Sequence, residues 1–167
     1  MLYENYISVN KSQFITKLKN ICNSLSIDPD WLMIVMYAES RVNPQAKNPY
    51  TNATGLIQFM PSTATDLGTS VNALYNMNNL QQLDYVYLYF KPYKGKIKDI
   101  YDLYLTTFFP VALGKSDSWV LQTSTMSSKL IAQQNPGVDL NKDLKITVGE
   151  FKQYVANYLK KKTLLQK

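Results

Sequence analysis

Glu39 is the residue of this chain best suited to acid–base chemistry. It follows the almost wholly apolar run 31–38, where ionising a carboxyl group is costly. Asp28 and Pro29 are typical of a helix N-cap and first position, so the sequence predicts a buried helix over 29–40 with Glu39 near its C-terminus. Because apolar surroundings and the negative end of the helix dipole both favour the protonated carboxyl, we expect Glu39 to serve as a general acid near neutral pH.

The composition leaves carboxylate chemistry as the main choice. The 167 residues contain no histidine and a single cysteine, Cys22. Ser-His-Asp and Cys-His catalysis and the common zinc centres are therefore excluded. Cys22 lies on the apolar face of a helix predicted over 11–26, so we interpret it as a buried packing thiol.

Apolar periodicity predicts helices along nearly the whole chain. Further helices are expected over 61–66, 79–90, 99–107 and 127–134, and a last one carries an apolar stripe at Phe151, Tyr154, Val155, Tyr158 and Leu159. The polar, turn-rich segment 48–55 predicts a loop or small hairpin that walls a groove. We therefore expect a mainly α fold, with at most a minor hairpin, in a single domain over residues 1–167.

Charge and hydropathy limit the partners of the chain. A formal charge of +6 favours an anionic partner, but the sequence lacks a recognition-helix pattern, which argues against nucleic acid. The first residues lack the features of a secretory signal peptide, and no apolar run approaches the length of a membrane span. The oligomeric state stays open.

The residues from Glu39 onward resemble the motif of lysozyme-like lytic transglycosylases and goose-type lysozymes. The matching residues are Glu39-Ser40, Asn43-Pro44, Ala46, Gly55-Leu56, Gln58, Met60-Pro61 and Thr63-Ala64. The resemblance implies a lysozyme-like fold and cleavage of the β-1,4 bond between N-acetylmuramic acid and N-acetylglucosamine in peptidoglycan. It also implies that Glu39 is the single acid/base, beside a groove formed by Ser40, Gln58 and Met60.

Besides Met60, four side chains are candidates for contacting the glycan or orienting the acid. Ser40 offers a hydroxyl to the carboxyl of Glu39, although serine at a helix C-terminus is often only a satisfied surface hydroxyl. Gln58 has donors and acceptors for an N-acetyl or hydroxyl group, and Tyr50 presents a ring in the polar loop. The chain lacks the family's Ala-Tyr-Asn-Ala-Gly segment, and Tyr104 is the candidate for its tyrosine.

The reaction type depends on whether a second carboxylate reaches the site. The loop 48–54 has no acidic residue, whereas an inverting hydrolase needs a carboxylate to activate water. This favours the transglycosylase reaction, which uses Glu39 alone, the substrate's own N-acetyl and C6 hydroxyl groups, and no catalytic cofactor. Asp66 and Asp84 are other candidates for the second carboxylate, so lysozyme-type hydrolysis stays open. Chitinase-type hydrolysis and an inactive glycan-binding virion module are the remaining alternatives.

The segment 101–115 is more similar to phage-encoded members of this family than to bacterial housekeeping members. This similarity predicts a bacteriophage protein that acts in the host periplasm or cell wall. We expect delivery either by release, as an endolysin, or as a component of the virion.

A second group of polar residues, at 139–150, has the spacing of an EF-hand calcium loop. The candidate ligands are Asp139, Asn141, Asp143, Lys145 and Glu150. Leu144 replaces the glycine expected at the sixth position, at the cost of a left-handed backbone. Thr147 and Glu150 alone also form a capping box for the last helix. The segment 139–150 is therefore interpreted either as a site for a structural calcium ion or as a plain helix cap.

Overall fold

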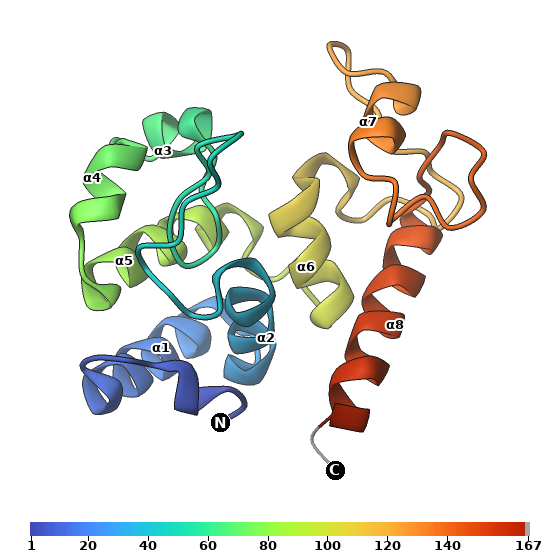
Figure 1. Ribbon diagram of the computed structural model, residues 1–167. Helices are drawn as coiled ribbons and strands as arrows, with labels where there is room; N and C mark the ends of the chain where they lie inside the picture. The colour runs from blue at the N-terminus through green and yellow to red at the C-terminus, as the bar shows by residue number, and fades with distance from the viewer. Residues whose placement is uncertain (166–167) are drawn as a thin grey trace. The chain divides into compact units, whose positions relative to one another are not determined.

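The computed structural model describes the backbone of residues 1–165 and the side chains of residues 1–162. Within that range the chain is mainly helical, as predicted, with isolated β-bridges in place of named strands (Figure 1). It divides into two compact units, Met1–Asp99 and Ile100–Lys167. The single domain expected over 1–167 stays a prediction.

The first unit contains five α-helices, and four of them begin and end within one residue of the predicted ranges. They are α1 (Lys11–Leu25), α2 (Pro29–Ser40), α3 (Pro61–Asp66), α4 (Val71–Asn76) and α5 (Asn79–Phe90), with short 3-10 turns at Glu4–Tyr6 and Lys91–Tyr93. Helix α4 is not among the helices predicted from the sequence. That helix has six residues and buries only Leu74, so it shows too little apolar periodicity to be recognised.

Local capping explains where the two central helices of this unit begin. The Asp28 carboxylate accepts a hydrogen bond of 2.8 Å from the Asp30 N–H, and Pro29 stands at the first helical position of α2. At α5, Asn78 and Gln81 form a reciprocal capping box. Helix α1 packs against both α2 and α5 (Figure 1).

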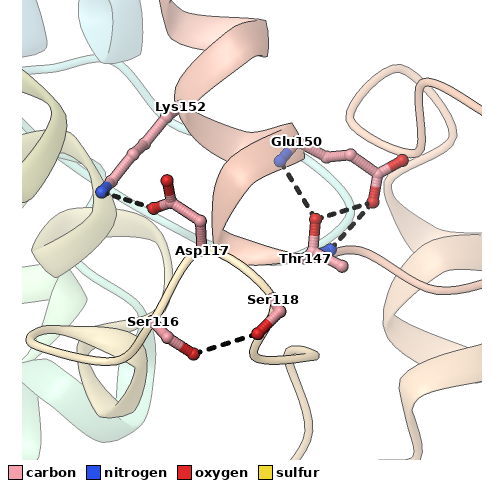
Figure 2. A network of polar contacts seen from close by, with 6 residues as sticks. All are labelled: Ser116, Asp117, Ser118, Thr147, Glu150 and Lys152. Carbon is pink, nitrogen blue, oxygen red and sulfur yellow. Dashed lines mark hydrogen bonds and ion pairs between the residues drawn. The ribbon is translucent and has the colours of Figure 1, made fainter.

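The second unit contains α6 (Ile100–Phe108), a 3-10 turn at Pro110–Ala112, α7 (Ser128–Gln134) and α8 (Val148–Leu165). Helices α6 and α8 pack through aromatic rings, with Tyr104 and Phe108 both against Phe151. The start of α8 is tied to the loop before α7, because Lys152 forms an ion pair of 2.8 Å with Asp117 (Figure 2).

None of the helices in the part of the chain described combines the length and apolar character required to cross a membrane.

Cys22 is fully buried within the core of the first unit, as predicted. Burial, with a smaller contribution from the negative charge of Asp28, raises the pKa of the Cys22 thiol to about 12. The reactive thiolate is therefore scarce at neutral pH, and the packing interpretation is confirmed.

An aromatic disulfide reagent at pH 8 should therefore react with Cys22 at least about a hundredfold more slowly in the folded protein than in guanidinium chloride. The release of the coloured thiol measures both rates. Comparable rates would mean that the side chain is accessible, which contradicts its position in the core.

Candidate active site

Glu39 lies in the last turn of α2 and is half-buried. The helix is enclosed on most sides, and its buried residues are Leu32, Met33, Ile34, Val35, Met36, Tyr37 and Ser40. The prediction of a buried helix with Glu39 near its C-terminal end is confirmed. The same apolar packing that holds the helix fixes the position of Glu39.

The chain turns sharply directly after Glu39 and Ser40. Arg41 and Val42 both have left-handed backbone angles, with φ of 57° and 59°. A β-branched residue rarely adopts this conformation, so the turn at Val42 carries backbone strain. The Val42 N–H donates to the Met36 carbonyl at 3.2 Å and the buried Val42 side chain packs into the core, which together hold the turn.

The segment after this turn forms the predicted loop or small hairpin. Isolated antiparallel bridges join Thr54 to Lys47 on one side and to Phe59 on the other. Tyr50 stands at the tip with 92% of its surface exposed. The ring is therefore available to a ligand, although its predicted glycan contact stays a prediction.

Residues 55–59, here called the motif loop, are held at Leu56 by side chains from two helices. The hydroxyl of Ser40 in α2 lies 2.8 Å from the Leu56 carbonyl and 3.0 Å from the Met36 carbonyl, and donates to them. The amide oxygen of Gln82 in α5 accepts a hydrogen bond of 2.9 Å from the Leu56 N–H. Both polar groups of the Leu56 peptide backbone are thus fixed by buried side chains, one of which is adjacent to Glu39.

Gln82 is the hub of this arrangement and has no exposed surface. Its amide nitrogen donates to the carbonyls of Pro44, at 2.5 Å, and Leu74, at 2.7 Å. One side chain therefore joins α5 to α4, to the motif loop and to the turn after α2. Gly55 is required by the same contact, because a Cβ atom there would lie 2.5 Å from the Gln82 amide oxygen.

Gln58 is the one half-buried residue of the otherwise buried motif loop, and the exposed Met60 follows the loop directly. The Gln58 amide nitrogen donates to the carbonyls of Ala46 and Gly55, each at 3.1 Å, so its donors hold the loop closed. Its amide oxygen accepts no hydrogen bond from the described residues, so it can accept a hydrogen bond from a ligand. Met60 is 45% exposed at the N-cap of α3, which is compatible with its predicted place in the groove.

Tyr89 of α5 is a further candidate site residue, which the sequence alone does not single out. Burial, the neighbouring Tyr93 and the charge of Glu39, in that order, raise the pKa of the Tyr89 phenol above its ordinary value. Its ring also contacts Phe59 of the motif loop, edge to face, with centroids 6.4 Å apart. Tyr89 follows Gln82 by seven residues, two helical turns, and this spacing is the signal that places both on one face of α5.

The two candidates for a second carboxylate are placed differently. Asp84 forms an ion pair of 2.7 Å with Lys17 of α1. It follows Gln82 by two residues, so it points away from the face of α5 that holds the motif loop. Asp66 is exposed at the C-terminal end of α3.

The remaining predicted site residues lie in the second unit. Tyr104 is 8% exposed and its ring packs edge to face on Phe151, so its glycan contact stays a prediction. Within the described residues, no three acidic, histidine or cysteine side chains are gathered as a metal centre. In the loop 139–150, Asp139 is buried, Glu150 is half-buried, and Asn141, Asp143 and Lys145 are exposed.

The helix, turn and loop that surround Glu39 lie within a segment whose sequence matches a known protein family. Residues 19–86, from within α1 to within α5, match the model of the transglycosylase SLT domain. No curated protein matches the chain. The predicted resemblance to lysozyme-like lytic transglycosylases is confirmed over this segment. This segment is similar to the transglycosylase SLT domain, and the mainly helical structure is consistent with a lysozyme-like fold. The similarity supports peptidoglycan cleavage in general.

The hub role of Gln82 predicts a large loss of stability in Gln82→Leu. Leucine has a similar size but leaves the Leu56 N–H and the Pro44 carbonyl buried without partners. Each such group costs about 1–3 kcal/mol, so the free energy of unfolding in urea should fall by at least about 2 kcal/mol.

The matched control is Gln13→Leu, at an exposed position on α1, which should change that free energy by less than about 0.5 kcal/mol. Equal small effects of the two substitutions would show that the motif loop does not depend on Gln82.

Proposed function

We propose that this chain cleaves the β-1,4 bond between N-acetylmuramic acid and N-acetylglucosamine by the lytic transglycosylase reaction, with Glu39 as the single acid and base. The observation that carries the proposal is the placement of Glu39. Glu39 lies in the last turn of a buried helix, and the hydroxyl of the next residue, Ser40, donates a hydrogen bond to the motif loop. The substrate would lie against Gln58 and Met60, where this segment reaches the surface.

In the first step Glu39 acts as the acid. Its carboxyl proton passes to the glycosidic oxygen as the bond from that oxygen to C1 of the muramic acid breaks. The oxygen of the substrate's own N-acetyl group bonds to C1 and compensates the developing positive charge. Glu39 is left as a carboxylate, and no metal ion or protein nucleophile is needed.

In the second step Glu39 acts as the base. The C6 hydroxyl of the same muramic acid attacks C1, its proton passes to the Glu39 carboxylate, and the bond to the N-acetyl oxygen breaks. The product ends in a 1,6-anhydro ring, and Glu39 is again protonated. A single carboxyl group therefore completes the cycle.

Other side chains of the first unit have properties suited to this reaction. The exposed ring of Tyr50 offers a stacking surface, and Gln58 offers an amide oxygen to an N–H or hydroxyl group of the sugar. Tyr89 keeps its proton at neutral pH, as any ordinary phenol does, and burial raises its pKa further. Its phenol is therefore a hydrogen-bond donor near Glu39, and we assign it a positioning role.

Hydrolysis by water is the main alternative. Asp84 is engaged by Lys17, and the loop 48–54 contains no acidic residue, so the first unit supports the single-carboxylate reaction better. An inactive glycan-binding module would retain the groove but leave cell walls intact. A chitinase-type enzyme would cleave chitin oligomers in preference to peptidoglycan, and parallel assays on both substrates separate these alternatives.

The site of action follows from the substrate. An enzyme that cleaves peptidoglycan glycan strands works at the bacterial cell wall, and the net charge of +6 favours its attraction to anionic wall polymers. Origin from a bacteriophage, as an endolysin or a virion component, stays a prediction.

Glu39→Gln keeps the shape of the side chain and removes the transferable proton. Glycan cleavage should fall by at least about a hundredfold while the fold is retained. Release of dye from labelled peptidoglycan measures the rate, and circular dichroism checks the fold. Glu4→Gln removes a half-buried carboxylate of the same unit, which pairs with Lys11, and should cleave at the wild-type rate. Wild-type activity in a folded Glu39→Gln protein would refute the mechanism.

The muramic acid end of the product should be the 1,6-anhydro form, because the C6 hydroxyl takes the place of water. Mass spectrometry distinguishes it, since the anhydro product is lighter than the hydrolytic product by one water molecule. Asp66→Asn should leave the product unchanged. Fully hydrated ends that disappear in Asp66→Asn would instead identify a hydrolase with Asp66 as its second carboxylate.

A further inference from the structure

Asp139 is a buried carboxylate in the second unit with one oxygen unused. Only 3% of the surface of Asp139 is exposed. One oxygen, Oδ2, accepts a hydrogen bond of 3.1 Å from the Leu144 N–H. The other, Oδ1, is buried and has no hydrogen-bond partner among the described residues. A buried, charged oxygen without a partner is costly, so its presence points to a cation that completes it.

The backbone after Asp139 is wound into a compact loop around this side chain. Leu144 has a left-handed φ of 65°, although it replaces the glycine expected there. Its side chain is 43% exposed, so the conformation costs backbone strain but no steric clash within the core. The sharp turn at the sixth position of the predicted calcium loop is therefore made despite the missing glycine.

Glu150, at the twelfth position, reaches back across the loop. Its Oε2 accepts hydrogen bonds from the Thr147 N–H at 2.9 Å and the Thr147 hydroxyl at 3.1 Å (Figure 2). Its Oε1 lies 3.4 Å from the Asn141 N–H and accepts from it. The capping box is therefore present, and the same carboxylate already connects the first turn of α8 to the third position of the loop.

The end of the loop is fixed by main-chain bonds to the segment before α7. The Leu121 N–H donates to the Ile146 carbonyl at 2.8 Å, and the Val148 N–H donates to the Trp119 carbonyl at 3.0 Å. Ile146 is fully buried. The loop thus rests on a rigid support, which lowers the entropy lost when a ligand is bound.

We propose that the loop 139–150 binds a calcium ion through the unused oxygen of Asp139. Further ligands are the side-chain oxygens of Asn141 and Asp143, the main-chain carbonyl of Lys145 and the carboxylate of Glu150. The three carboxylates of this set are not gathered in the structure, so binding requires Glu150 to turn from the capping box toward the ion. An all-oxygen set suits a hard divalent cation, and the irregular loop suits calcium better than the strictly octahedral magnesium ion. This inference does not depend on the proposed glycan cleavage.

The ion competes with the capping box for Glu150 and has to keep Leu144 in its strained conformation. We therefore expect a dissociation constant on the order of 10⁻⁴ M, at the weak end of the range for such loops. The ion would be structural, because it would join the entry of the loop at Asp139 to the first turn of α8.

The full chain, treated with a chelator and dialysed, should bind one calcium ion by isothermal titration calorimetry. Addition of millimolar calcium should raise the midpoint of thermal unfolding by about 3 °C or more, because a ligand that binds only the folded state stabilises it. Absence of both the binding heat and the shift would overturn the proposal and leave Thr147 and Glu150 as an ordinary helix cap.

Glu150→Gln is the variant that separates a calcium site from a plain helix cap. The glutamine amide oxygen keeps the capping box, and the substitution removes the charge and the long contact with the Asn141 N–H. Its midpoint without calcium should stay close to the wild-type value, and its response to calcium should be lost. Asp139→Asn should lose the response as well. A calcium response of wild-type size in both variants would show that the ion binds elsewhere and would refute the site.

The matched control is Asp117→Asn, which removes an equal charge from an exposed residue paired with Lys152 outside the loop (Figure 2). It should keep the calcium response in full. A response lost equally in Asp117→Asn would mean that calcium acts through general charge screening, which also refutes the site.

Discussion

The two hydrogen bonds of the Leu56 backbone are the constraint on which the candidate active site depends. Ser40 binds the carbonyl and Gln82 binds the N–H, so the motif loop is fixed between the end of α2 and the middle of α5. Because these groups are buried, the loss of either side chain leaves a polar group unsatisfied in the core. The position of Glu39 relative to the motif loop is thus set by the same bonds that stabilise the first unit.

This dependence explains what three residues of the motif do. Ser40 and Gly55 serve the loop itself, one through its hydroxyl and the other because a Cβ atom would collide with Gln82. Gln58 uses its amide donors to close the loop and has only its oxygen left for a ligand. The motif therefore encodes mainly a rigid frame around one carboxyl group, as expected when catalysis relies on preorganisation.

The sequence predicted the parts of the structure that local physics determines. Asp28, Pro29 and the apolar run that follows specify the start and burial of α2, so the place of Glu39 could be inferred. The hydrogen bonds of Gln82 to Leu56 and Pro44 and the contact of Tyr89 with Phe59 join residues more than twenty positions apart, and no local pattern reveals them. Leu144 shows the opposite case: the residue type argued against a left-handed turn, but the surrounding loop imposes it.

The central claim is that the glycan lies along the motif loop with its scissile bond at Glu39. The most direct measurement is a crystal structure of the Glu39→Gln variant with a tetrasaccharide of alternating N-acetylglucosamine and N-acetylmuramic acid. We predict a glycosidic oxygen within hydrogen-bond distance of the side chain at position 39, with sugar contacts to Gln58 and Met60. A tetrasaccharide bound elsewhere, with no glycosidic oxygen near position 39, would contradict the account.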